Sequence, residues 1–429
     1  MGTEKKQDSD VIDKVATIVL AGGQGTRLHP LTESRCKPAV SFGGRYRLID
    51  IPISNSLNSH ITRIFVISQY FASDLNKHIL ETYRLDAFRS DRIELLCPEE
   101  TSSSKVWFKG TADAVRQNLS HLMKSPSEYF LILSGDQLYN INFSQMMHFA
   151  KKTDADLVIA SLPVEEPEAK RMGLLRISET ENVIEFSEKP TDPQILRKFQ
   201  LSHDLLQREH LKSSKIPLYL GSMGIYVFKR SALISILENE GEDFGRHIIP
   251  IQVQKGKTFA FVYTGYWEDI GTISSYYQAN LALITHKTCL DVYDEMNPIY
   301  THPHNLPSPM FKHVLVKDSL ISQGSVIEAQ EISQSVIGIR AHIKQGTIIR
   351  NSIIMGNHAA SFSPSKPLYG IGENCLIQKA IIDEGCNIGN NVQLINKNHL
   401  DKYDGDGIYI REGIIIVTNG ASVPDNFAL

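Results

Sequence analysis

The sequence predicts an α/β domain built on a mostly parallel sheet, followed by a second domain that is a parallel β-helix. From residue 15 to about residue 284, short apolar runs alternate with segments of helical periodicity. That alternation is typical of a parallel sheet with helices on both faces. After residue 311, single aliphatic side chains recur every five or six residues, as in a β-helix whose short strands each turn one side chain inward. A length of 429 residues also favours two domains.

The first domain is expected at residues 15–285. Its strands should fall on the apolar runs near 15–21, 63–69, 93–97, 129–134 and 156–163, separated by helical patterns such as 74–84, 112–123 and 144–152. The runs at 63–69 and 129–134 are almost wholly apolar, as strands buried on both faces are. Residues 1–14 are expected to form a flexible tail.

A linker is expected at 286–311, because four prolines interrupt a polar stretch that has no periodicity. The β-helix is expected at 312–429. Its inward positions would be Ile321, Ile327, Ile332, Ile337, Ile343, Ile349, Ile354, Ile371, Ile377, Ile382, Ile388 and Leu394, with Gly338, Gly372 and Gly389 each after an isoleucine. Residues 355–370 break the rhythm and should loop out. The period of 2 that an alternating antiparallel sheet needs is absent, and the strand edges of a β-helix favour oligomerisation.

Composition excludes several classes of protein. A net charge of −4 and a pI near 6.4 argue against nucleic acid or a membrane surface as the main partner. No apolar run approaches the ~20 residues that span a bilayer, and the first residues do not form a signal peptide, so we expect a cytoplasmic protein. The five cysteines form no C-x-x-C pair, which favours reduced thiols. Cys36 lies between Arg35 and Lys37, which could lower its pKa, although a small residue in a packed turn is the simpler interpretation.

Residues 21–41 contain the most informative motif. Gly22, Gly23 and Gly25 follow the first strand, so they form a turn at its carboxyl end, where open α/β sheets bind ligands. Their backbone N–H groups can hold phosphate oxygens. Arg27 and Lys37 add the two kinds of cation that hold polyphosphate. The motif is neither G-x-G-x-x-G nor a P-loop, since no G-K-[ST] closes it.

Further short motifs follow in order at 22–28, 37–40, 43–50, 54–55, 69–70, 107–114, 135–136, 188–190, 222–226 and 267–272. Together they resemble the sugar-nucleotide pyrophosphorylases, and within them the glucose-1-phosphate adenylyltransferase (ADP-glucose pyrophosphorylase) family. The resemblance runs from about residue 15 to about residue 424. It implies a Rossmann-like nucleotidyltransferase sheet followed by a left-handed parallel β-helix of hexapeptide-type repeats. It also implies transfer of AMP from ATP to α-D-glucose 1-phosphate, giving pyrophosphate and ADP-glucose, the glucosyl donor for glycogen or starch synthesis.

The same resemblance assigns roles to individual residues. Arg27, Lys37 and Asp136 would be catalytic, and Asp136 and Asp269 would hold Mg²⁺, which prefers few protein oxygens and several waters. The sugar phosphate and ADP-glucose would contact Phe108, Gly173, Glu188, Lys189 and Ser222, and the nucleotide would contact Gly22, Gly23, Gly25, Thr26, Gln69, Trp107, Gly110 and Thr111. A buried core position is the alternative for Trp107. No protein nucleophile is required, because the sugar phosphate oxygen is already an anion.

Two positions depart from the usual family pattern: Phe108 stands where many members have tyrosine, and Gln137 where histidine is usual. Family members are typically tetramers controlled by anionic metabolites, so we expect a homotetramer. Arg35, Arg47 and Arg411 are the candidate effector-binding cations, and Arg411 stands where lysine is usual.

Three alternatives stay open. A UDP- or dTDP-glucose pyrophosphorylase shares the glycine loop, although residues 37–40 and 111–114 favour the adenylyl enzyme. A hexapeptide acyltransferase needs a catalytic histidine, and His342, His358 and His399 stand in no recognisable motif. A non-catalytic regulatory subunit is disfavoured because the charged set is intact: Arg27, Lys37, Asp136, Lys189 and Asp269 are all present.

Overall fold

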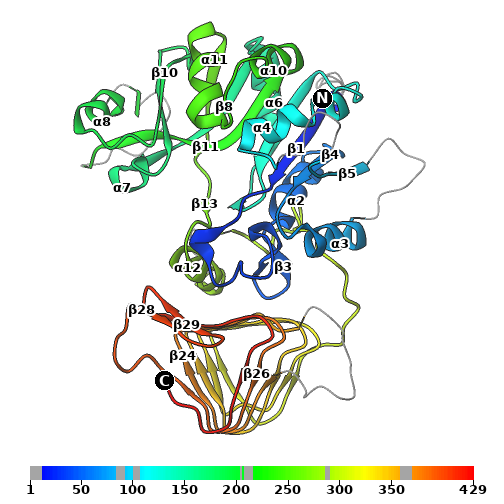
Figure 1. Ribbon diagram of the computed structural model, residues 1–429, viewed down its shortest axis with the longest axis vertical. Coiled ribbons are helices and arrows are strands. Elements are labelled where there is room, and N and C mark those ends of the chain that lie inside the picture. The colour runs from blue at the N-terminus through cyan, green and yellow to red at the C-terminus, as the bar shows by residue number, and fades with distance from the viewer. Residues whose placement is uncertain are drawn as a thin grey trace.

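The computed structural model describes residues 12–83, 92–99, 107–202, 205–206, 216–285, 290–357 and 370–429. Figure 1 shows an α/β domain above a β-helix. Most of the expected tail, the start of the expected linker with Cys289, and residues 358–369 of the expected loop lie outside the described residues. No helix in the described part of the chain is both long and apolar enough to cross a membrane.

The α/β domain is built on a mixed sheet with a parallel half. Among the described residues its main path is β10-β9-β11-β6-β1-β4-β5, with β8 beside β11 and β12 beside β8. The parallel half contains β1 (Val15–Ala21), β4 (Arg63–Ser68), β5 (Arg92–Leu96) and β6 (Tyr129–Ser134). Antiparallel pairings join β8 (Leu157–Glu165), β9 (Gly173–Ile177), β10 (Val183–Glu188) and β11 (Leu218–Lys229), while β12 (Thr258–Val262) is parallel to β8. The expected strands form, and the antiparallel part contains β9 and β10.

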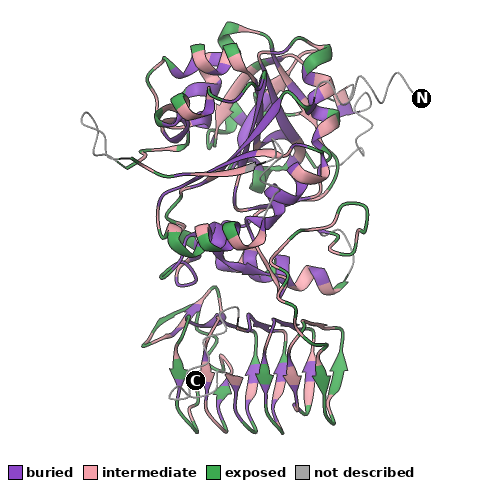
Figure 2. Cartoon of the chain, turned by 90° about the vertical axis from the view of Figure 1, so that its right-hand side faces the viewer, coloured by how far each residue is buried: buried purple, intermediate pink, exposed green. Residues whose placement is uncertain are grey.

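Helices cover both faces of this sheet. The described helices of this domain are α2 (Asp50–Asn58), α3 (Ala72–Thr82), α4 (Thr111–Gln117), α5 (Leu119–Leu122), α6 (Phe143–Lys152), α7 (Glu166–Ala169), α8 (Pro193–Phe199), α10 (Arg230–Leu237), α11 (Ile249–Lys255) and α12 (Ile273–Thr285). Of these, α12 packs against the β-helix. Ile18 of β1 packs in a cluster with α4, α10 and α11, whereas Val15 packs with α6 and Val19 with α2 and α3. The two faces of β1 are therefore both buried, as its apolar sequence indicates. Figure 2 shows that the strands inside the α/β domain are mostly buried. The pattern at 112–123 forms two short helices, α4 and α5, instead of one.

The described part of the linker crosses α2 and is held to it by hydrogen bonds. The backbone N–H of Tyr300 donates to Ser54 Oγ at 2.9 Å, and the Tyr83 hydroxyl donates to Tyr300 O at 3.0 Å. Asn58 Nδ2 donates to Pro298 O at 3.1 Å, and Leu290 is buried. This part of the segment therefore packs against the α/β domain. Its last residues join the β-helix, since Gly324 N donates to Pro307 O at 2.8 Å and residues 310–311 of the expected linker form a β-helix strand.

The β-helix consists of three sheets of short strands. The first contains β14 (Met310–Phe311), β17 (Val326–Ile327), β20 (His342–Ile343), β23 (Gly370–Ile371), β26 (Asn387–Ile388) and β31 (Ser422–Val423). The second contains β15 (Leu315–Lys317), β18 (Glu331–Ser333), β21 (Ile348–Arg350), β24 (Leu376–Gln378) and β27 (Gln393–Leu394). The third contains β16 (Leu320–Ile321), β19 (Val336–Ile337), β22 (Ile353–Ile354), β25 (Ala380–Ile382), β30 (Ile414–Val417), β29 (Ile408–Arg411) and β28 (Lys402–Asp404).

The aliphatic repeat predicted from the sequence fills the interior of these coils. All its members lie in one apolar cluster, except Ile321, which is partly buried and packs against that cluster. Coils stack so closely that a Cβ on Gly338 would lie 2.2 Å from Met355 O, which explains a glycine at this corner. The antiparallel pairings of β28 with β29 and of β29 with β30 are a local departure from the parallel pattern.

The two domains share a hydrophobic cluster. Leu31, Phe42 and Leu283 of the α/β domain pack in the same cluster as Ile353 and Ile416 of the β-helix. Backbone hydrogen bonds cross the same boundary, including one of 3.0 Å from Ile339 N to Gly44 O. The β-helix is therefore docked on the α/β domain through packed side chains and backbone contacts.

Candidate functional site

A cavity of about 720 Å³ opens at the carboxyl ends of β1 and β6. Its wall contains every predicted catalytic, nucleotide, metal and sugar-phosphate residue except Trp107. These residues come from the glycine loop after β1, the segment before α4, the end of β6, the β9–β10 pair, β11 and β13 (Trp267–Asp269). The fold therefore brings motifs that are far apart in the sequence to one edge of the sheet.

The glycine loop leaves its backbone open to this cavity. Gly25 has a φ of 63°, and a Cβ there would lie 3.0 Å from side-chain atoms of Lys37 and Thr32. Thr32 Oγ1 donates to Gly25 O at 3.0 Å and fixes the turn, which leads into the short helix η1 (Thr26–Leu28). A Cβ on Gly23 would meet nothing within 4 Å. The loop is thus tightly held at Gly25 and exposed at Gly23, as a site for phosphate oxygens requires.

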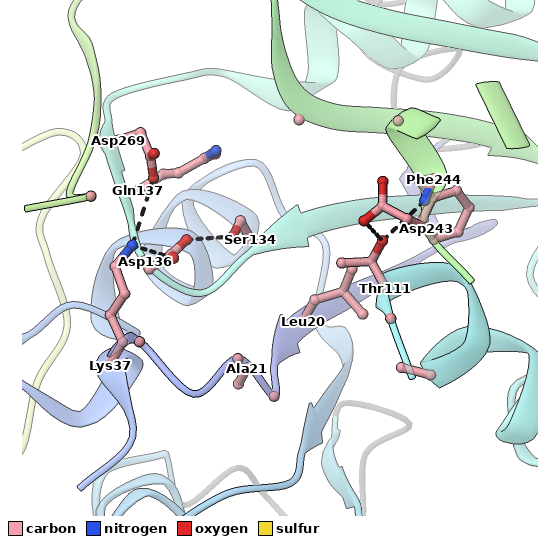
Figure 3. Close-up of a pocket in the computed structure, with 18 of the residues that line it drawn as sticks. Leu20, Ala21, Lys37, Thr111, Ser134, Asp136, Gln137, Asp243, Phe244 and Asp269 are labelled. Atoms are coloured by element: carbon pink, nitrogen blue, oxygen red, sulfur yellow. Dashed lines mark hydrogen bonds and ion pairs between the residues drawn. The ribbon is translucent and has the colours of Figure 1, made fainter. Parts of the chain in front are cut away.

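Lys37, Asp136 and Asp269 form an ion-paired group that we call the site cluster (Figure 3). Lys37 begins the short helix η2 (Lys37–Ala39), and Asp136 follows β6. Asp269 ends β13, whose antiparallel partner β7 (Gln137–Tyr139) places it opposite Gln137. Lys37 Nζ lies 2.6 Å from Asp136 Oδ2 and 3.8 Å from Asp269 Oδ1. One ammonium therefore holds two carboxylates together at the cavity wall.

The two carboxylates differ in their protonation equilibria. Burial acts to raise the pKa of Asp136, but the Lys37 ammonium and the Ser134 hydroxyl outweigh it, so its pKa lies below the ordinary value. Burial raises the pKa of Asp269, and the nearby Asp136 carboxylate adds to the rise. No group of three or more metal-ligating side chains gathers in the described ranges. Two carboxylates beside a phosphate-binding loop nevertheless fit Mg²⁺, because this ion takes its remaining ligands from water and substrate phosphates.

Glu188 and Lys189 lie on the antiparallel side of the cavity. The Lys189 backbone N–H donates to Met172 O at 3.0 Å, and Lys189 Nζ lies 3.5 Å from Glu188 Oε1. A Cβ on Gly173 would fall 2.8 Å from Glu188 Oε2, and one on Gly245 would fall 2.7 Å from it. Both glycines therefore make room for the Glu188 carboxylate. Burial raises its pKa, although the Lys189 ammonium opposes the rise.

Residues 16–286 match the family model described as nucleotidyl transferase, and residues 304–428 match the one described as GLGC left-handed parallel beta-helix domain. The first match covers more than half of the chain. The chain belongs to the glucose-1-phosphate adenylyltransferase family. Membership shows that it is a nucleotidyltransferase of the sugar-nucleotide pyrophosphorylase type and that its β-helix is of the left-handed kind.

One departure from the usual family pattern has a structural explanation. Gln137 Nε2 donates to Met223 O at 2.8 Å, and Trp267 Nε1 donates to Gln137 Oε1 at 3.4 Å. Gln137 therefore connects β11 to β13 and holds the strand that presents Asp269. Phe108 lines the cavity with an apolar ring, and nothing in the structure explains its replacement of tyrosine.

Of the two residues predicted to contact the nucleotide base or ribose, Gln69 is buried and Trp107 is exposed. The Gln69 side chain pairs with the Phe108 backbone, accepting from its N–H at 2.8 Å and donating to its carbonyl at 3.3 Å. Trp107 is 55% exposed and stacks on Tyr70 with ring centroids 4.9 Å apart. The alternative that Trp107 is a core residue is therefore wrong. The stacked pair stands at the rim, since Tyr70 lines the cavity.

Sequence reasoning missed further residues of the wall, among them Arg171, Asp243 and Phe244. Asp243 accepts hydrogen bonds from Thr111 Oγ1 at 3.2 Å and from Arg246 N at 3.0 Å, and begins the helical turn η3 (Phe244–Ile248). In Figure 3 Thr111, Asp243 and Phe244 lie across the cavity from the site cluster. Arg171, Asp243 and Phe244 stand in none of the predicted motifs, so only the fold places them in the wall.

The three predicted effector cations lie outside the cavity wall. Arg35 is buried at the domain junction, with Nη2 2.7 Å from Asp383 Oδ1 and Nη1 2.9 Å from Glu384 Oε1. Arg411 pairs with Asp404 and lies over the Tyr409 ring. Arg47 Nη1 donates to Ala39 O at 2.7 Å. All three are engaged within the chain, and Arg35 is the most completely enclosed.

Cys36 is buried beside this junction. Burial raises the pKa of its thiol to about 11, so the neighbouring cations do not activate it. The interpretation of Cys36 as a small residue in a packed turn therefore holds.

Proposed function

We propose that the protein transfers AMP from ATP to α-D-glucose 1-phosphate, giving ADP-glucose and pyrophosphate. The observation that supports this most strongly is the single cavity that joins a phosphate-binding loop, the site cluster and the Glu188–Lys189 pair. Each reactant then has cations of its own, and the acidic pair lies between them.

In this reaction an oxygen of the sugar phosphate attacks the α-phosphorus of ATP, and the bond to the β-phosphate oxygen breaks. The attacking oxygen is already an anion, so the protein supplies positions and charges instead of a nucleophile. Arg27, Lys37 and the loop N–H groups would hold the triphosphate and stabilise the charge that develops on the leaving pyrophosphate. Lys189 would hold the sugar phosphate, and Glu188 would accept hydrogen bonds from sugar hydroxyls.

Asp136 and Asp269 would hold Mg²⁺, which supplies charge neutralisation between the anionic reactants when it is bound. Lys37 would keep both carboxylates in place.

We also propose a division of labour along the chain. Residues 15–285 would catalyse, 286–311 would connect, and 312–429 would assemble a cytoplasmic homotetramer and bind anionic effectors. Arg411 and Tyr409 support the proposal that anionic effectors bind the β-helix. Arg411 lies over the Tyr409 ring, and Tyr409 also contacts His29 of the α/β domain, with 5.6 Å between ring centroids. Phosphate esters bound there would touch both domains and could couple to substrate affinity.

The test of the catalytic proposal is pyrophosphate release from glucose 1-phosphate with ATP, UTP and dTTP in turn, with and without phosphorylated metabolites. We expect ATP to be preferred under every condition. A preference for UTP or dTTP would favour the corresponding pyrophosphorylase. No release with any nucleotide would favour a regulatory subunit, and acetyl transfer from acetyl-CoA would favour an acyltransferase.

A further inference from the structure

Arg171 is a cation in the cavity wall to which neither the predicted roles nor the family match assigns a task. It stands between α7 and β9 and is exposed at the cavity. No ion pair or side-chain hydrogen bond joins its guanidinium to another described residue, unlike Lys37, which is paired with Asp136. Lys170 next to it is paired with Glu166 at 2.7 Å. The Arg171 charge acts at longer range on the Asp269 and Glu268 carboxylates. An exposed guanidinium that faces a cavity, with its donors not hydrogen-bonded to the described residues, is suited to an anionic ligand.

The surroundings of Gly271 show where this guanidinium lies. A Cβ on Gly271 would have Arg171 Nη2 at 3.4 Å, Asp269 Oδ2 at 3.4 Å and Arg27 Nη1 at 3.7 Å. Arg171 and Arg27 therefore approach the same point from two different segments. That point adjoins the carboxylate proposed to hold the metal, where the two reactants would meet.

The backbone attaches Arg171 to the side of the cavity that carries Glu188 and Lys189. Met172, the next residue, accepts the Lys189 N–H at 3.0 Å, and Gly173 is paired with Glu188 in the β9–β10 register. Arg171 is thus attached to the strand pair that carries the sugar-phosphate residues, whereas Arg27 belongs to the loop proposed for the triphosphate. The planar guanidinium can donate two parallel hydrogen bonds to one phosphate, which the Lys189 ammonium cannot do.

We propose that Arg171 binds the phosphate group of the sugar phosphate, together with Lys189, and turns its attacking oxygen toward the site cluster. This inference rests on the proposed function. Arg171 would then make the site selective: a sugar with a phosphate at its reacting end would bind more tightly than the same sugar without it.

The test compares Arg171→Ala and Arg171→Lys with Lys170→Ala, a matched control that removes a neighbouring cation directed elsewhere. Binding of glucose 1-phosphate, glucose and ATP to the full-length protein is measured by calorimetry with Mg²⁺, and KM values are measured alongside. Arg171→Ala should weaken glucose 1-phosphate binding about tenfold to hundredfold, as loss of a charge-assisted contact does. Binding of ATP should change less than about twofold. Arg171→Lys should be intermediate, and Lys170→Ala should behave as the wild type.

An equal or larger loss of ATP or pyrophosphate binding would overturn the inference, because Arg171 would then serve the polyphosphate. Unchanged binding in Arg171→Ala, or a wild type that binds no glucose 1-phosphate, would also overturn it. A wild type that binds glucose 1-phosphate through Arg171 but releases no pyrophosphate would refute the proposed function and leave this inference standing. Thermal unfolding of each variant shows whether it is folded.

Discussion

Two charged clusters in this molecule are built alike and differ in their access to water. The site cluster places Lys37 between Asp136 and Asp269, and the junction cluster places Arg35 between Asp383 and Glu384. The two cations are two residues apart in one loop. Side-chain exposures are 22% and 35% for the site carboxylates but 1% and 13% for those of the junction.

The difference separates the charges for which we propose a role in the reaction from the charges that hold the two domains together. In the junction cluster Arg35 and the Glu384 N–H donate to Asp383 Oδ1, and Arg35 and Ser41 donate to Glu384 Oε1. The domains bury this group, which leaves little access for a ligand. In the site cluster the carboxylates face the cavity and can still bind a cation or orient a substrate. One short loop therefore connects the reacting centre to the contact between the domains. This gives a physical route by which β-helix ligands could influence catalysis.

The largest expected effect is on turnover, from Asp136→Asn. The change removes a ligand charge without changing volume, so turnover should fall on the order of a thousandfold. The thermal unfolding midpoint should change less than for Arg35→Ala, because the Asp136 side chain is more exposed than the junction carboxylates. Steady-state rates at limiting Mg²⁺ check this, and a variant with wild-type turnover there would show that Asp136 is only structural.

The second effect is on stability, from Arg35→Ala. Removing the cation leaves two carboxylates without their partner at a buried position, which should cost about 3–5 kcal/mol of unfolding free energy. Urea unfolding measures the loss. Arg350→Ala is the control, since its pair with Glu331 lies on the β-helix surface and water can replace it. Equal losses in the two variants would mean that the junction cluster is no more important than a surface ion pair.

The third effect separates the two substrates within the cavity. Lys189→Gln should raise KM for glucose 1-phosphate about tenfold or more and change KM for ATP little, because a different group of cations holds the triphosphate. Kinetics with each substrate varied in turn test this. Parallel increases in both KM values would contradict the assignment of Lys189 to the sugar phosphate.

The smallest effect is a pH dependence of stability that the junction cluster should show. Burial raises the pKa of Asp383 to about 6 from an ordinary 3.8, since Arg35 only partly opposes this and Glu384 adds to it. The folded protein then binds this proton more tightly than the unfolded chain does. Its contribution to stability should therefore fall as pH rises from about 4 to about 6. The check is the unfolding free energy of the wild type minus that of Asp383→Asn, measured from about pH 4 to about pH 6. A difference that rises with pH over that window would contradict the prediction.

Much of this architecture is predictable because its signals are local. A single isoleucine per strand is enough to predict the β-helix interior, and the apolar runs at 15–21 and 129–134 are enough for β1 and β6. The glycine loop is also local, since its turn, its cations and the strand before it are neighbours in sequence.

Contacts between distant segments could not be predicted in the same way. Asp383 is 348 residues from Arg35, so nothing near either residue indicates the junction cluster, and Arg35 was expected to bind an effector. Arg171 stands in no motif and enters the cavity only because β9 pairs with β10. Trp107 is a large apolar residue of the kind that often packs in a core, but here it is exposed and stacks on Tyr70.

The most direct test of the proposed activity is the reverse reaction, run with radiolabelled pyrophosphate and ADP-glucose, UDP-glucose or dTDP-glucose in turn. We expect label to enter ATP from ADP-glucose, with release of glucose 1-phosphate, and to enter UTP or dTTP far more slowly. Asp136→Asn in the same assay should abolish most of the labelling. Faster labelling of UTP or dTTP, or no labelling of any nucleoside triphosphate, would contradict the account.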